Sequence, residues 1–371
     1  MGDLCGRLGI DVPVVQSGMG GVAGPDLAAA VSQAGGLGVL AALRLTPDAL
    51  RAHIRALRQQ TDRPFGVNIW LHDELLPPVA PERLDPELVA RVQHTLDGLR
   101  LSRGLPPGGD HLPAAVPDLI PDALQVMLDE RIPVFSAAVG LPSVELIERF
   151  HRVGSVVMAM VTTVGDAREA HRRGVDVVVA QGTEAGGHRS VGRKPSRADA
   201  AGTGTIVLVP AVRDALGPAV ALVAAGGIAD GRGLAAALVL GADGALLGTR
   251  FVATAESGAH PGWKAALLAR ERPTVLTDAI TGQWARVLRN ELTDRYDEAG
   301  PGVLPSLLQA SAAADLYAAA ARAGDVEVMP LYAGESAALV AGLPGAAEVV
   351  AQLVAEAERA LGRPIGGPAS R

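Results

Sequence analysis

One stretch of the sequence joins a buried-type strand to residues that can perform acid–base chemistry. Residues 175–189 read VDVVVAQGTEAGGHR, so a β-branched run leads into a glycine-rich turn that carries Glu184 and His188. A hydrophobic run without alternation needs apolar cover on both faces, as strands of a parallel α/β sheet have. Such folds keep their chemistry at the carboxyl ends of their strands. We therefore expect His188 to lie in a functional site.

Two further glycine-rich stretches follow short apolar runs, at residues 224–231 (AAGGIADG) and 248–251 (GTRF). Glycine lets backbone N–H groups approach a phosphate that a side chain would hold away. By count, these stretches follow strands seven and eight of a barrel, where phosphate commonly binds through loop N–H groups and a helix N-terminus. A single Gly-Gly pair is usually only a turn, but the two together predict a phosphate site.

Other strand ends carry Asn68, Gln181 and a bare loop, Gly18 to Gly21. Amide side chains can bond the pyrimidine edge of a flavin, and glycines admit its flat ring. With one phosphate site beside them, these residues favour flavin mononucleotide (FMN) as the cofactor.

The elements that position these residues alternate along the chain as short apolar runs and amphipathic Ala/Leu-rich segments. Eight such units predict an α/β fold, a closed (β/α)8 TIM barrel. The expected strands are residues 12–16, 37–41, 65–69, 132–136, 155–160, 175–180, 219–225 and 244–247, and the expected helices include 25–34, 46–59, 143–151 and 231–240.

Two segments are additional to the eight β-α units of a barrel. Residues 75–121 are rich in proline and hold one expected helix, 86–101, with Asp85 as its N-cap. Residues 259–334 are expected to form a mostly helical insertion after the eighth strand, before a last helix at 335–361. The expected division is a barrel of residues 1–258 and 335–361 and an insertion or subdomain of residues 259–334.

A Rossmann fold is the competing architecture, because Gly18-Met19-Gly20-Gly21-Val22-Ala23 formally satisfies the G-x-G-x-x-A fingerprint. That fold also wants an acidic residue about 20 positions further on to hold a ribose. The chain has Ala41 to Arg44 there, so a glycine loop beneath a planar ligand is the better interpretation.

The 371 residues are 49% hydrophobic and carry a formal net charge of −7, as expected of an ordinary soluble protein with a large core. An acidic chain with few aromatics offers no footprint for nucleic acid. A single cysteine, Cys5, excludes an internal disulfide, and Glu184-x-x-x-His188 has too few histidines for a zinc motif, so no metal is expected. No secretory signal or membrane-spanning run is recognised, so we expect a cytoplasmic protein.

The motifs resemble those of the nitronate monooxygenase family, once called 2-nitropropane dioxygenases. The matching stretches are AAAVSQAGGLG (28–38), PFGVNIW (64–70), VVAQGTEAGGHR (178–189), AAGGIADGRG (224–233) and LGADGALLGTRF (240–251), with weaker echoes in GQWARVLRN (282–290) and LYAGE (331–335). The family consists of FMN-dependent (β/α)8 barrels.

Carried over residue by residue, the resemblance implies that His188 is catalytic. It implies FMN contacts at Met19, Asn68, Gln181, Gly186, Gly187, Gly226, Gly227, Gly248 and Thr249. A histidine can take a proton from the carbon beside a nitro group or donate to an anionic nitronate.

One departure leaves the reaction open. Many nitronate oxidisers have Ser-Phe-His-Phe-Gly after strand four, whereas this chain reads Ser-Ala-Ala-Val-Gly at residues 136–140. The first hypothesis is an FMN-dependent monooxygenase that converts alkyl nitronates and dioxygen to carbonyl compounds and nitrite. The second is an NAD(P)H-dependent FMN reductase of enoyl thioesters or quinones, and the third is an FMN-binding module without turnover. The expected partners are a small-molecule substrate and dioxygen, with a homodimer left open.

Overall fold

Eight parallel strands form the barrel that the sequence predicts. In the computed structural model, which describes residues 3–191, 194 and 196–366, their order around the sheet is β1-β9-β8-β6-β5-β4-β3-β2. The ring closes because the N–H of Gln16 donates to the carbonyl of Leu37 and the N–H of Leu37 donates to that of Val14, both at 2.9 Å. The barrel strands are β1 (Val14–Gln16), β2 (Gly38–Ala41), β3 (Phe65–Trp70), β4 (Val134–Ala138), β5 (Val156–Val161), β6 (Val177–Gln181), β8 (Ala221–Ala225) and β9 (Gly244–Leu247).

All eight predicted strands are thus confirmed, with ends that move by two residues or fewer. Their unbroken hydrophobic runs are explained by two separate cores. Inside the barrel, Val15, Val39, Val177 and Val223 pack together, and the helix α1 (Leu4–Leu8) closes the bottom of this core. The opposite faces of the strands pack against the surrounding helices.

The helix signals in the sequence also place most helices correctly. Asp85 caps α4 by accepting a hydrogen bond from the N–H of Glu87 at 3.0 Å, and Ser143 caps α6 through the N–H of Leu146. The helices up to the eighth barrel strand are α2 (Pro25–Gln33), α3 (Pro47–Gln60), α4 (Pro86–Leu101), α5 (Ile120–Asp129), α6 (Val144–Arg152), α7 (Val164–Arg173), α8 (Arg197–Ala201), α9 (Thr205–Leu216) and α10 (Gly231–Val239), with the 3-10 turn η1 (Pro81–Arg83).

The segment after the barrel contains a hairpin that the sequence does not predict. Strands β10 (Thr274–Thr277) and β11 (Ala285–Leu288) pair antiparallel, and β11 also pairs with the two-residue strand β7 (Gly187–His188). The helices here are α11 (Thr249–Val252), α12 (Pro261–Ala269), α13 (Glu291–Ala299), α14 (Leu308–Ala312) and α15 (Ala314–Ala323).

The prediction of one last helix over residues 335–361 is wrong. The chain instead forms the 3-10 turn η2 (Glu335–Leu339), a break at 340–345 and the helix α16 (Ala346–Leu361). Pro344 disfavours helical geometry in the residue before it, and Glu256 accepts a hydrogen bond from the N–H of Ala346 at 2.8 Å, which fixes the start of α16.

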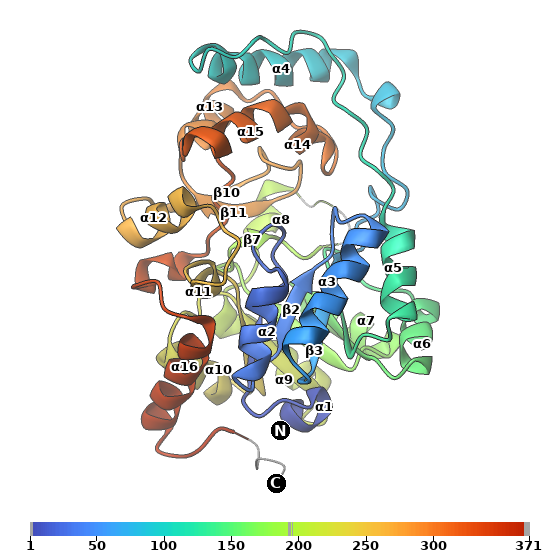
Figure 1. The fold of residues 1–371 in the computed structure, drawn as a ribbon, viewed down its shortest axis with the longest axis vertical. Helices are drawn as coiled ribbons and strands as arrows, with labels where there is room; N and C mark the ends of the chain where they lie inside the picture. The colour runs from blue at the N-terminus through green and yellow to red at the C-terminus, as the bar shows by residue number, and fades with distance from the viewer. Residues whose placement is uncertain (1–2, 192–193, 195, 367–371) are drawn as a thin grey trace.

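The inserted segments cover the end of the barrel away from the two termini. Figure 1 shows α13, α14 and α15 above the barrel and α4 above them, while N and C lie at the bottom. Arg100 of α4 joins these layers by donating to Asp315 at 2.9 Å and to the carbonyl of Ala312 at 2.6 Å. The division into a barrel (1–258, 335–361) and an insertion (259–334) remains a proposal.

None of the described helices is a candidate for crossing a bilayer. The longest, α4 and α16, have 16 residues each and carry charged side chains.

Candidate active site

His188 lies above the carboxyl end of β6, as the sequence predicts. Its backbone belongs to β7, where it pairs with Ala285 of the hairpin. The side-chain amide of Gln181, the last residue of β6, donates to the carbonyl of His188 at 2.8 Å and accepts from the N–H of Ser190 at 2.8 Å. Both ends of this amide therefore hold the histidine loop in place over the barrel.

The imidazole of His188 is partly buried between aromatic rings. The ring centroid of Trp70 lies 4.4 Å away in an edge-to-face arrangement, and that of Tyr332 lies 5.1 Å away. Nε2 is 2.7 Å from the hydroxyl of Thr281, while Nδ1 makes no hydrogen bond to a described residue. One ring nitrogen is thus anchored and the other is left for a ligand.

The same surroundings keep this imidazole neutral. Burial, with smaller contributions from the positive charges of Arg44 and Arg189, lowers the pKa of His188 from 6.5 to about 3. His188 is therefore not an imidazolium at neutral pH, and it offers one N–H donor and one lone pair.

The loop between Gln181 and His188 is held by buried cations and by a helix cap. Arg189 donates to the carbonyl groups of Gly182, at 2.8 Å, and Ala185. Arg286 donates to the carbonyl of Thr183 at 3.0 Å. The carboxylate of Glu184 accepts from the N–H of Thr205 at the start of α9, so it caps that helix from the histidine loop.

Residues 331–335 (LYAGE), a weaker motif match, join this loop to the exit of β9. A side chain at Gly186 would overlap the backbone of Ala333 and Gly334, so glycine is required for this approach. The N–H of Gly334 donates to Thr249 at 2.9 Å, and that of Glu335 donates to the carbonyl of Glu184 at 2.9 Å. The segment that carries Tyr332 is in this way fastened to two strand ends.

The exits of β8 and β9 expose unpaired backbone donors. Among the described residues, the N–H groups of Gly226, Gly227 and Gly248 have no hydrogen-bond partner. These three N–H groups at neighbouring strand ends are therefore available to a bound acceptor. Glycine is needed at Gly227 because its φ is +75°.

The helix N-terminus expected at this phosphate site is not free at α10. Asp230 accepts from the N–H of Gly233 at 3.1 Å, and Glu356 accepts from that of Gly231 at 2.9 Å. Two carboxylates thus take donors of α10, so a phosphate at a helix N-terminus would lie at α11, and the phosphate site stays a prediction. The short helix α11, which has no side-chain cap after Gly248, keeps its first donors.

Met19, after β1, and Asn68, within β3, complete the set. A Cβ placed on Gly248 would lie 3.5 Å from the sulfur of Met19, and one on Gly18 would overlap Asn68. Asn68 donates to the hydroxyl of Ser136 at 2.9 Å, and its Oδ1 has no partner among the described residues. Gly187 has open space on its side-chain face. Nine of the ten predicted site residues therefore lie at or beyond the carboxyl ends of barrel strands, and Asn68 lies two residues before the end of β3.

The exit of β4 is apolar, as its sequence predicts. Ala138 and Val139 are buried, and Val139 has a φ of +52°, which is rare for a β-branched residue. Its N–H donates to the hydroxyl of Ser190 at 2.8 Å, and Ser190 donates to the carbonyl of Met160 at 2.9 Å. The strained turn is therefore held by the segment that follows His188.

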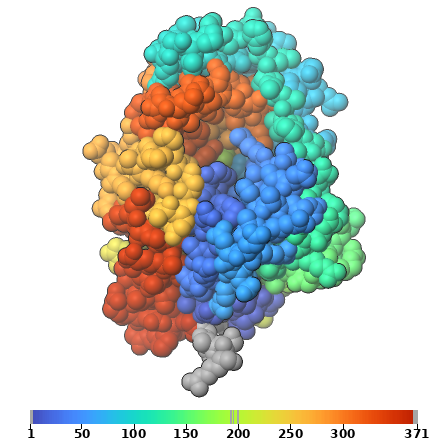
Figure 2. All heavy atoms as spheres, viewed as in Figure 1, coloured from blue at the N-terminus to red at the C-terminus, as the bar shows by residue number. Residues whose placement is uncertain are grey.

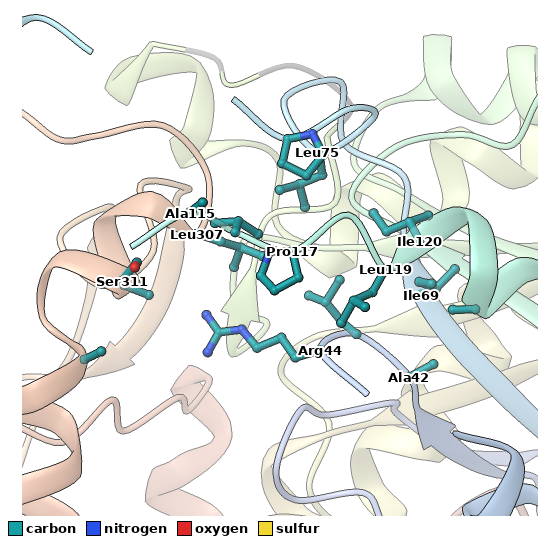
Figure 3. Close-up of a pocket in the computed structure, with 16 residues that line it drawn as sticks. Ala42, Arg44, Ile69, Leu75, Ala115, Pro117, Leu119, Ile120, Leu307 and Ser311 are labelled. Atoms are coloured by element: carbon teal, nitrogen blue, oxygen red, sulfur yellow. The ribbon is translucent and has the colours of Figure 1, made fainter. Parts of the chain in front are cut away.

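A cavity of about 260 Å³ opens beside these residues (Figure 3). Its walls come from the turn after β2, the end of β3, the segment before α5, and α14 with its flanks. Figure 2 shows the matching recess between the blue segment around α3 and the orange segment around α14 and α15. Ile69, Leu75, Ile120 and Leu307 make it apolar, and Arg44 is the charged residue among the described residues that line it.

Four residues of this site were not predicted: Arg44, Trp70, Thr281 and Tyr332. Trp70 and Tyr332 lie inside the PFGVNIW and LYAGE motifs, and the chain has only three tryptophans and three tyrosines. A rare aromatic inside a shared motif was therefore a usable signal. Nothing in the sequence marked Arg44 or Thr281, because their partners lie far away along the chain.

The polar segment 189–204 is, from its sequence, either a candidate lid or a solvated loop. Lys194 in this segment pairs with Asp278 at 2.6 Å and lies 5.3 Å from the ring centroid of Trp284. Arg193 lies outside the described residues. In the part of the chain that the structure describes, no group of three or more His, Cys, Asp or Glu residues could hold a metal ion.

Comparison with known proteins gives consistent matches over nearly the whole chain. The family model described as nitronate monooxygenase matches residues 3–356. A nitronate monooxygenase of Paraburkholderia phytofirmans is 37% identical over 366 residues, which cover 95% of this chain and 94% of the relative. The crystal structure of nitroalkane oxidase from Streptomyces ansochromogenes is 38% identical, covers 95% of this chain and 97% of its own, and has a TM-score of 0.85. FabK from Thermotoga maritima is 31% identical, with 98% and 97% coverage and a TM-score of 0.73.

Proposed function

The chain belongs to the nitronate monooxygenase family, and we propose that it is an FMN-dependent enzyme that oxidises alkyl nitronates with dioxygen to carbonyl compounds and nitrite. The observation that carries this proposal is the position of His188. A neutral imidazole with one anchored nitrogen lies between two aromatic rings, at the same end of the barrel as three unpaired glycine N–H groups.

The residues present fit FMN. The unpaired N–H groups of Gly226, Gly227 and Gly248 can take a terminal phosphate, with the first turn of α11 beside them. The free Oδ1 of Asn68 and the open faces of Gly20, Gly21 and Gly187 leave room and an acceptor for a flat ring. Met19, Gly186 and Thr249 shape this space, whereas Gln181 acts through the loop that it holds. These are our proposed cofactor-binding residues, with His188 as the catalytic one.

Bound FMN supplies a reversible electron acceptor that can react with dioxygen. The chain itself binds and orients the nitronate and keeps water out. Trp70 and Tyr332 shield the imidazole, and Thr281 fixes its rotation.

We assign the tautomer in which the hydroxyl of Thr281 donates to Nε2 of His188. In this tautomer Nδ1 carries the single N–H of the neutral ring and can donate it to a nitronate oxygen. Because its pKa is depressed, this histidine is a weak base, so we expect preformed nitronates to react far better than neutral nitroalkanes.

The test is anaerobic mixing of the purified protein with a panel of electron donors. We expect the protein to be yellow, to release FMN on denaturation, and to lose its flavin absorbance on mixing with ethyl nitronate. His188→Asn keeps a side-chain donor, so it should slow ethyl nitronate less than His188→Leu does. Bleaching by NADH but not by any nitronate would contradict the proposal, and a colourless protein that takes up no FMN would contradict the whole site.

One observation favours a second candidate, an NAD(P)H-dependent FMN reductase of enoyl thioesters or quinones. The buried Ala138 leaves the β4 exit without a polar group, and the neighbouring cavity is apolar. The greater structural similarity to nitroalkane oxidase favours the first candidate. A cytoplasmic location and a homodimer remain predictions.

A further inference from the structure

The apolar cavity is separate from the proposed FMN residues, and it adjoins the surroundings of His188 because the N–H of its lining residue Leu307 donates to the carbonyl of Thr281 at 2.8 Å. Its walls include Ile69, Leu75, Ile120 and Ala310, and none of the glycines or amides assigned to FMN lines it. A space of about 260 Å³ has room for about eight heavy atoms, at about 30 Å³ each. Ligand sites of this kind are mostly apolar, with a few placed polar groups that set orientation.

Arg44 provides that polar group. It makes no hydrogen bond or ion pair to another side chain among the described residues, and no carboxylate lines the cavity beside it. Figure 3 shows its guanidinium extending among the lining residues near Pro117. Its backbone has a φ of +72°, an unfavourable conformation for arginine, and such strain clusters at functional sites.

Arg44 also lies close to the aromatic cluster around His188. Burial lowers the pKa of His188 and raises that of Tyr332, and the positive charge of Arg44 adds to the first effect and opposes the second, so it is within electrostatic reach of both. Arg44 thus lines the apolar cavity and also acts on the proposed catalytic group.

We propose that the enzyme selects nitronates with a linear alkyl chain of about six to eight carbons, whose anionic group lies between Arg44 and His188 and whose chain fills the cavity. This inference rests on the proposed function and names its substrate class. Charge complementarity supports the occupant, because an unpaired guanidinium at the edge of an apolar space matches an anion with an apolar tail.

The first test measures binding with unreactive carboxylates, which share the planar two-oxygen anion of a nitronate. Isothermal titration of the FMN-loaded protein should give octanoate about 100-fold tighter binding than butanoate, because each buried methylene contributes about 3- to 4-fold. Equal affinities for the two acids would overturn the proposal.

Three variants separate the charge from the cavity. Arg44→Asn, chosen because asparagine tolerates a positive φ, should weaken the binding of both carboxylates by about 10- to 100-fold. The ratio of octanoate to butanoate affinity should stay the same. Ala310→Leu, which fills the cavity from α14, should reduce the ratio of octanoate to butanoate affinity at least about 10-fold. Ala318→Leu, exposed on α15 outside the cavity, is the matched control and should change neither value.

Val116→Phe, on the irregular segment before α5, repeats the filling test if Ala310→Leu does not fold. An unchanged ratio in whichever filled variant folds would overturn the proposal, as would unchanged affinity in Arg44→Asn.

The second test is steady-state oxidation of the nitronates of nitroethane and 1-nitrooctane. We expect a higher kcat/KM for the nitronate with the longer chain, and we expect this preference to disappear in the variant whose cavity is filled. Turnover of ethyl nitronate without this preference would overturn the inference and leave the proposed function standing. No turnover of either nitronate would overturn both, and NADH consumption with 2-octenoyl thioesters would then identify the tail as an acyl chain.

Discussion

At the scale of single residues, the site combines one neutral histidine with one unpaired arginine. His188 is kept neutral by its burial and by positive charges around it, and Thr281 holds its Nε2 at 2.7 Å. The imidazole can therefore donate a hydrogen bond without carrying a charge. The positive charge at the proposed substrate site comes instead from the guanidinium of Arg44.

The pH dependence of the reaction follows from the neutral state of His188. A pKa lowered to about 3 means that His188 binds a proton only in strong acid and stays neutral as the pH rises. We expect kcat/KM for a preformed nitronate to show no titration of His188 between pH 5 and pH 9. Rate profiles of the wild type and of His188→Asn should be parallel there. A wild-type step near pH 6.5 that the variant lacks would show that His188 acts as an imidazolium.

Thr281 is a positioning residue whose role can be separated from a structural one. Thr281→Val keeps the shape but removes the hydroxyl from Nε2, and we expect kcat/KM for ethyl nitronate to fall about 10-fold, the effect of one lost hydrogen bond. Thr281→Ser should recover most of the rate because it restores the hydroxyl. If both variants lose activity equally, the packing of the methyl group matters more than the hydrogen bond.

At the scale of elements, the site depends on how loops from β6, β8 and β9 are held against each other. Arg189 and Arg286 fix the carbonyls of the β6 loop, and Gly334 fastens residues 331–335 to Thr249. The N–H groups of Gly227 and Gly248 have no hydrogen-bond partner among the described residues. The glycines matter where the backbone itself is the ligand-binding group.

A substitution at Gly248 tests whether the glycine backbone itself binds the phosphate. Its φ of −106° suits any residue, and a Cβ there would make only an ordinary contact with Met19, so Gly248→Val should fold. The added side chain would block the approach of a phosphate, and we expect the dissociation constant for FMN to rise about 10- to 100-fold in a fluorescence titration. Gly98→Val, exposed on α4, is the matched control, and equal FMN retention in both variants would remove Gly248 from the phosphate site.

At the scale of the whole molecule, the cap over the barrel is joined by buried charged contacts. Arg100 of α4 is 3% exposed in its side chain and bonds to Asp315, Gln93 and the carbonyl of Ala312. Arg103 makes further contacts to Asp325 and Glu291. Because residues 307–314 of the cap line the cavity, its shape depends on this packing.

Removal of the Arg100 contact should weaken the cap. Arg100→Met fills a similar volume but leaves the carbonyl of Ala312 and the amide oxygen of Gln93 unpaired, at about 1 to 3 kcal/mol each. We expect urea unfolding to show a free energy of unfolding lower by about 2 to 4 kcal/mol. Arg172→Met, at an exposed ion pair on α7, should leave it close to the wild-type value. Equal stability of the two variants would show that the cap is held by apolar packing alone.

The local pattern of the sequence determined the barrel and most of its helices. Unbroken β-branched runs, proline at the first turn and caps such as Asp85 act within a few residues, so they predict strands and helix ends without knowledge of the rest of the chain. The same locality explains the prediction of a helix over residues 335–361. The break at 340–345 is stabilised by Glu256, which lies 90 positions away.

The tertiary structure decided which residues meet at the site. His188 and the glycine exits follow barrel strands, so their common location was predictable from the order of the strands. Thr281 and Tyr332 reach His188 only because the hairpin of β10 and β11 pairs with β7, and Arg44 meets the cavity only because α14 folds over the barrel. Contacts of this kind depend on the packing of segments that are distant in the chain, and no spacing within the sequence encodes them.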